Sequence, residues 1–128
     1  MRIDEISAIV VDEAIGIHRE FGLGLFESVY ESVLAGRLQS RGLAADRQVA
    51  IQAVFDGELL DAAFKMDILV EQALVLEIKA VDQLTKAHAK QLLTYLRIMK
   101  QPVGLPLNFN GATMKEEIRR LVNDYRPD

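Results

Sequence analysis

Two charged residues interrupt an apolar segment in the middle of the chain. Glu77 and Lys79 lie within Leu74–Val81, whose other members are all apolar. Because successive side chains of a β-strand point to opposite faces, the two charges share one face of this strand. Burying charge without a partner costs several kcal/mol. The pair is therefore either an internal ion pair or part of a site that needs both charges.

A third charge, Asp67, stands in the apolar segment just before this one. A hairpin turn centred on Gln72 would set Asp67 opposite Glu77, with their Cβ atoms about 5 Å apart. Two carboxylates at that distance repel each other unless a cation lies between them, and oxygen ligands suit Mg²⁺, with Mn²⁺ as a substitute. Lys79 could then orient the attacking water and stabilise charge on a phosphate. The alternative is that Asp67 is an ordinary surface residue near a turn.

Apolar spacing and chain-breaking residues predict the elements that must position these groups. Helices are expected over residues 3–21, 26 to about 42, 84–100 and 114–125, and strands over 48–55, 59–70, 74–81 and 103–109. Pro106 inside the last strand predicts an edge position or a bulge, because proline lacks a backbone N–H. The order ααβββαβα predicts a single α/β domain over residues 1–128, tending to α+β, with a mixed sheet flanked by helices.

Composition narrows the classes of site that are open to this chain. Its 128 residues include no cysteine and two histidines, which excludes disulfides and thiolate metal sites and makes a histidine metal site improbable. The formal net charge is −4, but residues 1–78 carry −8 and residues 79–128 carry +4. The basic half either faces a phosphate backbone or is a solvated helix face. The acidic N-terminal segment lacks a long apolar run, so we expect no membrane span and a cytoplasmic location.

Two motifs together resemble one family. Asp67 is followed after nine residues by Glu77-x-Lys79, and Gly24-x-x-Glu27-x-x-Tyr30 lies upstream. The chain resembles the GxxExxY protein family, a branch of the PD-(D/E)xK nuclease superfamily, over roughly residues 16–110. Three shorter matches follow in the family's order, namely Arg47-Gln48-Val49, Gln91-x-x-x-Tyr95 and Leu107-Asn108-Phe109.

The resemblance implies a restriction-endonuclease-like fold and a role for each matching residue. Asp67 and Glu77 become catalytic metal ligands, joined by the backbone carbonyl of Ile78 and by Glu27, while Lys79 becomes the catalytic lysine. Supporting roles fall to the remaining matches, which are Tyr30, Gln48, Gln91 and Tyr95. No organic cofactor is implied.

The residues themselves leave alternatives open at two of these positions. Glu27 follows a glycine-rich break, and a carboxylate in the first turn of a helix is favoured by the helix dipole whether or not it has a further role. Tyr95 could equally be plain core packing. We therefore expect a Mg²⁺-dependent nuclease acting on DNA or RNA, and the alternative is a non-catalytic nucleic-acid-binding or protein-interaction module with the same fold. A homodimer also stays open.

Overall fold

The computed structural model describes residues 1–101, 103–111 and 121–122, with residues 60–64, 121 and 122 described by backbone alone. In this part the chain forms three helices and five strands. They are α1 (Ile3–Phe21), α2 (Glu27–Ser40), β1 (Ala45–Phe55), β2 (Glu58–Val70), β3 (Leu74–Lys79), α3 (Lys86–Met99), β4 (Val103–Asn108) and β5 (Leu121–Val122).

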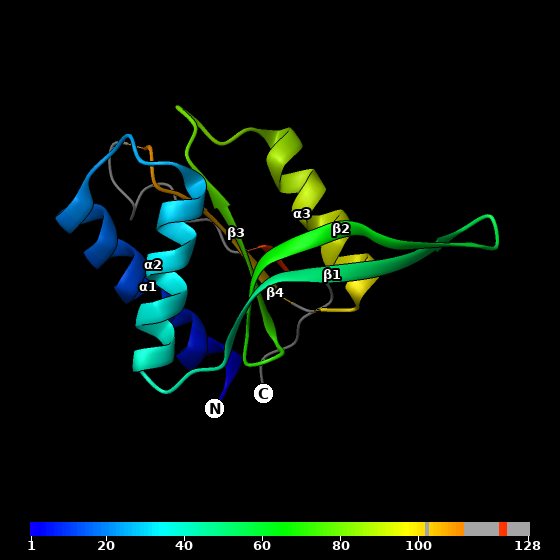
Figure 1. Ribbon diagram of the computed structural model, residues 1–128, viewed down its shortest axis with the longest axis horizontal. Coiled ribbons are helices and arrows are strands. Elements are labelled where there is room, and N and C mark those ends of the chain that lie inside the picture. Colours follow the sequence, from blue (N-terminus) through cyan, green and yellow to red (C-terminus); the bar gives the residue numbers. More distant parts are fainter. Residues whose placement is uncertain (102, 112–120, 123–128) are drawn as a thin grey trace.

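The five strands form one mixed sheet in the order β1-β2-β3-β4-β5. β3 and β4 are parallel, and α3 makes the connection between them, whereas the other neighbours are antiparallel. The β1–β2 hairpin extends well beyond the helices (Figure 1). The mixed sheet with helices on both faces confirms the predicted α/β class and its restriction-endonuclease-like architecture.

The helices cover the two faces unequally (Figure 1). α1 and α2 pack together on one face, over a large apolar cluster that includes Leu76 and Ile78 of β3. α3 covers the other face, where Leu92 and Leu96 pack against Val75. Because side chains alternate along β3, Glu77 and Lys79 belong with Val75 on the α3 face.

A glycine allows α3 to approach the sheet closely. A Cβ added at Gly104 of β4 would lie 3.2–3.3 Å from atoms of Leu92 and Leu96. Contacts that short are tighter than ordinary packing, so a larger residue would push α3 outward. The helix is therefore held close to the face that carries the two charged residues of β3.

The predicted turn between β2 and β3 is confirmed, with one difference at its far end. Pairing runs from Val70↔Leu74 to Ile68↔Leu76, which centres the turn on Gln72 as predicted. The next pair in this register would be Asp67 and Glu77, but the ladder ends before it. The two residues are therefore not a pair of the described ladder, and the Asp67 side chain accepts from the Ile78 N–H instead.

Two predictions for the C-terminal part are corrected. Leu121 and Val122, inside the predicted helix 114–125, form β5, and residues 114–120 and 123–125 of that helix lie outside the described residues. β4 lies between β3 and β5, so the edge position predicted from Pro106 is wrong for the strand as a whole. The β3–β4 ladder also shows no register shift, and hence no bulge. Pro106 is tolerated because the described pairing with β5 ends two residues earlier, at Gly104.

The helices of the described ranges include none that combines the length and apolar character needed to cross a membrane.

Candidate active site

The predicted metal ligands meet along one edge of β3. On the side of β2 the backbone ladder stops at Leu76, and side chains take over the next amides. Asp67 Oδ2 accepts a hydrogen bond from the Ile78 N–H at 2.7 Å, and Glu27 Oε2 accepts one from the Ala80 N–H at 2.9 Å. Two carboxylates from distant parts of the chain therefore lie next to each other along a single strand edge.

The backbone carbonyl of Ile78 belongs to the same edge. In a strand, the N–H and C=O of one residue point to the same side, and those of the next residue point to the other. The Lys79 carbonyl accepts from the Phe109 N–H on the β4 side at 2.9 Å, which places the Ile78 carbonyl on the opposite side. Along that edge it follows the Ile78 N–H held by Asp67 and precedes the Ala80 N–H held by Glu27. Oxygen atoms of three different residues, Asp67, Ile78 and Glu27, thus follow one another along this edge of β3.

Glu77 is the most perturbed ionisable group of the site. Its side chain is nearly buried, and its Oε2 finds no hydrogen-bond partner in the described structure. The pKa of Glu77 is raised to about 8, first by burial and then by the negative charge of Asp67 and a side-chain hydrogen bond with it. Lys79, whose Nζ lies 4.0 Å from Glu77 Oε1, acts in the opposite direction, and Glu27 adds a smaller increase. Glu77 therefore keeps its proton at neutral pH.

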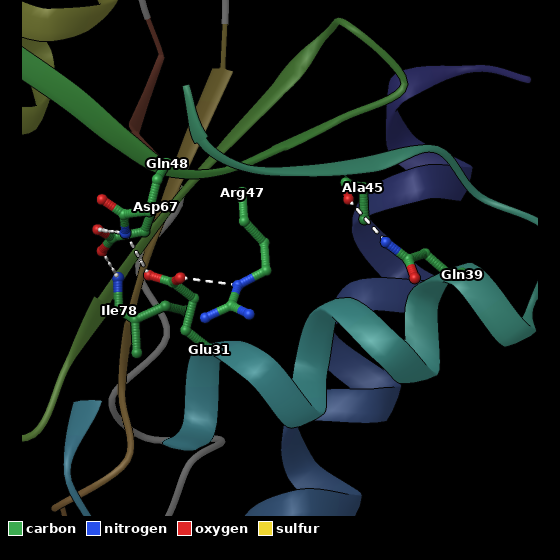
Figure 2. Close-up of polar contacts among 7 residues, drawn as sticks. All are labelled: Glu31, Gln39, Ala45, Arg47, Gln48, Asp67 and Ile78. Atoms are coloured by element: carbon green, nitrogen blue, oxygen red, sulfur yellow. Dashed lines mark hydrogen bonds and ion pairs between the residues drawn. The ribbon is translucent and has the colours of Figure 1, made fainter. Parts of the chain in front are cut away.

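A buried glutamate on α2 organises the approach to Asp67 (Figure 2). Glu31 is only 5% exposed, and its two oxygens accept from Arg47 Nε at 2.9 Å and from Gln48 Nε2 at 2.7 Å. The same Gln48 nitrogen lies 3.4 Å from Asp67 Oδ1. One carboxylate on α2 therefore holds the amide that contacts the first predicted metal ligand.

The backbone of Gln48 is unusual at this contact. Its φ of 51° lies in the left-handed region of the backbone, which residues other than glycine and asparagine rarely adopt. Arg47 and Val49 on either side pair normally with β2, but Gln48 has no partner in that ladder, and its position in the register is opposite Asp67. Strained backbone of this kind is found most often at functional sites. Here the strain accompanies an amide that reaches both Glu31 and Asp67.

The other residues of the GxxExxY motif hold the loop that precedes Glu27. Tyr30 is fully buried and stacks on Phe109 with ring centroids 4.5 Å apart. Its hydroxyl donates to the Gly22 carbonyl at 2.7 Å and accepts from the Leu25 N–H at 3.3 Å. Tyr30 thereby fixes the loop before α2, and supports the site through structure rather than through contact with the carboxylates.

Gly24 ties the same loop to the end of β4. Its N–H donates to Asn110 Oδ1 at 3.1 Å, and its φ of 93° suits glycine. The first and last residues of the motif, Gly24 and Tyr30, thus hold the segment that places Glu27 next to Ala80.

Asn108 belongs to one of the short motif matches, and in the structure it holds the chain after β3 in place. It is fully buried, and its side chain exchanges two hydrogen bonds with the backbone of Val81, at 3.0 and 2.8 Å. These bonds extend the β3–β4 ladder by one step beyond Lys79 through a side chain. They hold the segment that follows the predicted catalytic lysine.

The α3 residues are placed differently from one another. The pKa of Tyr95 is raised by partial burial and by the negative charges of Glu77 and Asp67. Gln91 is exposed one turn earlier, and no hydrogen bond described here ties it to the carboxylates. His88 caps α3 in a reciprocal pair with Thr85.

The described residues contain no preformed cluster of three carboxylate or histidine side chains around one point. The reason is visible in the contacts, because Asp67 and Glu27 each direct one oxygen to a separate amide of β3. The donor chemistry nevertheless fits a hard cation, since the groups are carboxylate and carbonyl oxygens. The buried and unpartnered Glu77 Oε2 is the further sign of such a fit.

The fold and this acidic strand end define a class, that of restriction-endonuclease-like domains with a mixed sheet between helices. A family model for the PD-(D/E)XK nuclease superfamily matches residues 4–121, and the chain belongs to that superfamily. No curated protein and no solved structure shows a significant match to it.

Proposed function

We propose that this protein is a Mg²⁺-dependent nuclease of the GxxExxY branch, able to use Mn²⁺, that hydrolyses phosphodiester bonds of DNA or RNA. The observation that carries the proposal is the acidic edge of β3. Asp67 and Glu27 occupy successive free amides of that edge, and a protonated, buried Glu77 adjoins them. Superfamily membership supports the same reading.

Each residue has a definite task in this proposal. Asp67, Glu77, Glu27 and the Ile78 carbonyl would hold Mg²⁺, which when bound supplies positive charge to the phosphate and acidifies water. Lys79 is partly buried on the same face as Glu77, so its ammonium is kept near the reacting phosphate and donates to its oxygens. Glu31 and Gln48 position Asp67 from behind.

The deciding experiment is a cleavage assay over single- and double-stranded DNA and RNA, with Mg²⁺, with Mn²⁺ and with EDTA. We expect metal-dependent cleavage that falls at least about 100-fold in Lys79→Ala, because a donor aimed at developing charge is worth that much. Lys90→Ala, which removes an exposed lysine of α3, is the matched control and should retain full activity. Metal-independent cleavage, or equal activity of the two variants, would contradict the proposal.

A second candidate function is a nucleic-acid-binding or protein-binding module that keeps the fold without catalysis. The absence of a preformed three-ligand cluster among the described residues favours it. Calorimetric titration separates the two, because a nuclease should bind Mn²⁺ and lose that binding in Asp67→Ala. A module should bind oligonucleotides while being indifferent both to the metal and to this substitution.

A further inference from the structure

A pocket of about 280 Å³ lies between the start of α3 and β4, on the face of the sheet that carries Glu77. Its apolar wall comes from Leu84, Ala89 and Pro106. Pro106 pairs with Glu77 in the β3–β4 ladder, and paired residues of neighbouring strands point to the same face of the sheet. The pocket wall is therefore one strand away from the buried carboxylate. It also lies at the carboxyl ends of parallel strands, where ligands of α/β proteins usually bind.

The polar part of the wall consists of groups that donate hydrogen bonds or carry positive charge. Nδ1 of His88 accepts from the Thr85 N–H at 3.1 Å, so a neutral His88 carries its proton on Nε2, which is then a donor. Lys86 and Gln83 add a cation and an amide. None of the described residues that line this pocket carries a carboxylate, although the chain as a whole has a net charge of −4.

We propose that this pocket binds one unpaired nucleotide adjacent to the scissile phosphate, and that the nuclease therefore prefers single-stranded or frayed substrate. The inference rests on the proposed function. A flat base suits the wall of Leu84, Ala89 and Pro106, its acceptor atoms suit His88 Nε2, and its phosphate suits Lys86. The volume is at the lower end of ligand pockets, which fits one base and leaves no room for a base pair.

The first test measures nucleotide binding without any cleavage step. The full-length ¹⁵N-labelled protein is titrated with AMP and UMP, and in parallel with inorganic phosphate, in EDTA. We expect both nucleotides to shift the amides of His88 and Ala89 in saturable fashion, and phosphate alone to bind at least about 10-fold more weakly, because stacking of the base contributes to affinity. Equal binding of phosphate and nucleotide would remove the base from the pocket and overturn the proposal.

A substitution that fills the pocket gives the matched comparison. Ala89→Phe should weaken nucleotide binding at least about 10-fold, while Ala87→Phe, two residues earlier on the exposed side of α3, should leave it unchanged. Lys86→Glu, at an exposed position, reverses the charge at the rim and provides a second variant if Ala89→Phe fails to fold. Unchanged nucleotide binding in a folded Ala89→Phe, or in Lys86→Glu where it replaces that variant, would refute the pocket.

Cleavage kinetics then separate this inference from the proposed function. On single-stranded oligonucleotides Ala89→Phe should raise KM at least about 10-fold with little change in kcat, and wild type should cleave duplex ends more slowly than single strands. If the wild type is active and Ala89→Phe has the same KM, the nucleotide-binding role of the pocket is wrong and the nuclease assignment stands. Nucleotide binding by a wild type that cleaves no substrate would remove the nuclease assignment, and with it the placement next to a scissile bond.

Discussion

The two edges of β3 satisfy their backbone groups in different ways. Toward β4, all six residues from Leu74 to Lys79 pair in a regular parallel ladder. Toward β2, the ladder covers three residues, and then the carboxylates of Asp67 and Glu27 accept from the amides of Ile78 and Ala80. A completed ladder has no unused polar group, whereas a carboxylate on an amide keeps a second oxygen and a charge. Two of the proposed metal ligands, Asp67 and Glu27, lie on the edge where the ladder stops.

The acidic edge has an energetic cost that the other edge lacks. Three carboxyl groups interact there, and burial together with the Asp67 charge forces Glu77 to retain a proton. The regular edge should therefore be insensitive to pH and to conservative substitution, and the acidic edge should be sensitive to both. The four predictions below test that difference, from the largest expected effect to the smallest.

The largest effect concerns Glu77 and pH. Its pKa rises from 4.5 to about 8 on folding, so between these values the folded protein holds a proton that the unfolded chain has released. The free energy of unfolding should therefore be highest below pH 4.5 as far as this group is concerned, and should fall as the pH rises through 8. The largest loss of unfolding free energy that this group can cause is about 5 kcal/mol, because a pKa difference of one corresponds to about 1.36 kcal/mol.

Urea denaturation between pH 5 and pH 9 in EDTA measures this slope. Glu77→Gln, which stays neutral at every pH, should flatten it, and Glu58→Gln at the exposed start of β2 is the control that should not. A wild type and a Glu77→Gln variant with identical slopes would show that Glu77 is ionised in the folded protein.

The next effect compares two substitutions of Asp67. Asp67→Ala leaves the Ile78 N–H without its acceptor and should cost about 1 to 3 kcal/mol. Asp67→Asn keeps a carbonyl acceptor and removes a charge that repels Glu77, so its unfolding free energy in EDTA should be unchanged or higher. Chemical denaturation of both variants at pH 8 is the measurement. A loss above about 2 kcal/mol in Asp67→Asn would mark the carboxylate as structural.

The same contrast explains which parts of the fold could be read from the sequence. The turn on Gln72 and the register of β2 with β3 follow from local apolar alternation and were predicted correctly. The end of that ladder at Leu76 was not predicted, because it depends on the contacts that residues of α2 and β1 make in the folded protein. β5 was also missed, since a two-residue strand within an apolar pattern of helical period is defined only by its partner β4.

The candidate site divides along the same line. Glu77 and Lys79 are visible without a structure, because charges inside an apolar strand need either each other or a site that uses both. Glu31 was not predicted, although it lies one turn after Glu27 on the same helix face, since an acidic residue on a helix is ordinarily solvated. Its burial becomes evident only when β1 brings Arg47 and Gln48 against α2.

The third prediction tests this missed residue. Glu31→Gln removes a buried charge from between Arg47 and Gln48 and should lower the unfolding free energy by about 1 to 2 kcal/mol. Glu20→Gln breaks the exposed ion pair with Arg37 and should cost under about 0.5 kcal/mol. Thermal denaturation of both variants, paired with cleavage rates, is the test. Equal stability of the two variants would mean that Glu31 is solvated in the folded protein.

The smallest effect on stability is expected at Glu27. Glu27→Gln keeps a carbonyl that accepts from the Ala80 N–H, so the only loss is a negative charge near the start of α2, worth a few tenths of a kcal/mol. Because that same charge belongs to the proposed metal ligands, cleavage and Mn²⁺ affinity should fall about 10-fold or more. Measuring the thermal midpoint, the Mn²⁺ titration and the cleavage rate on one preparation separates the two roles.

A matched variant strengthens this last comparison. Ser28→Ala changes the neighbouring exposed position on the first turn of α2 and should alter neither the midpoint nor the rate. Unchanged cleavage and Mn²⁺ affinity in Glu27→Gln would reduce Glu27 to a side chain that replaces a missing backbone acceptor. The acidic edge of β3 would then differ from the regular edge at Asp67 and Glu77, but no longer at the amide of Ala80.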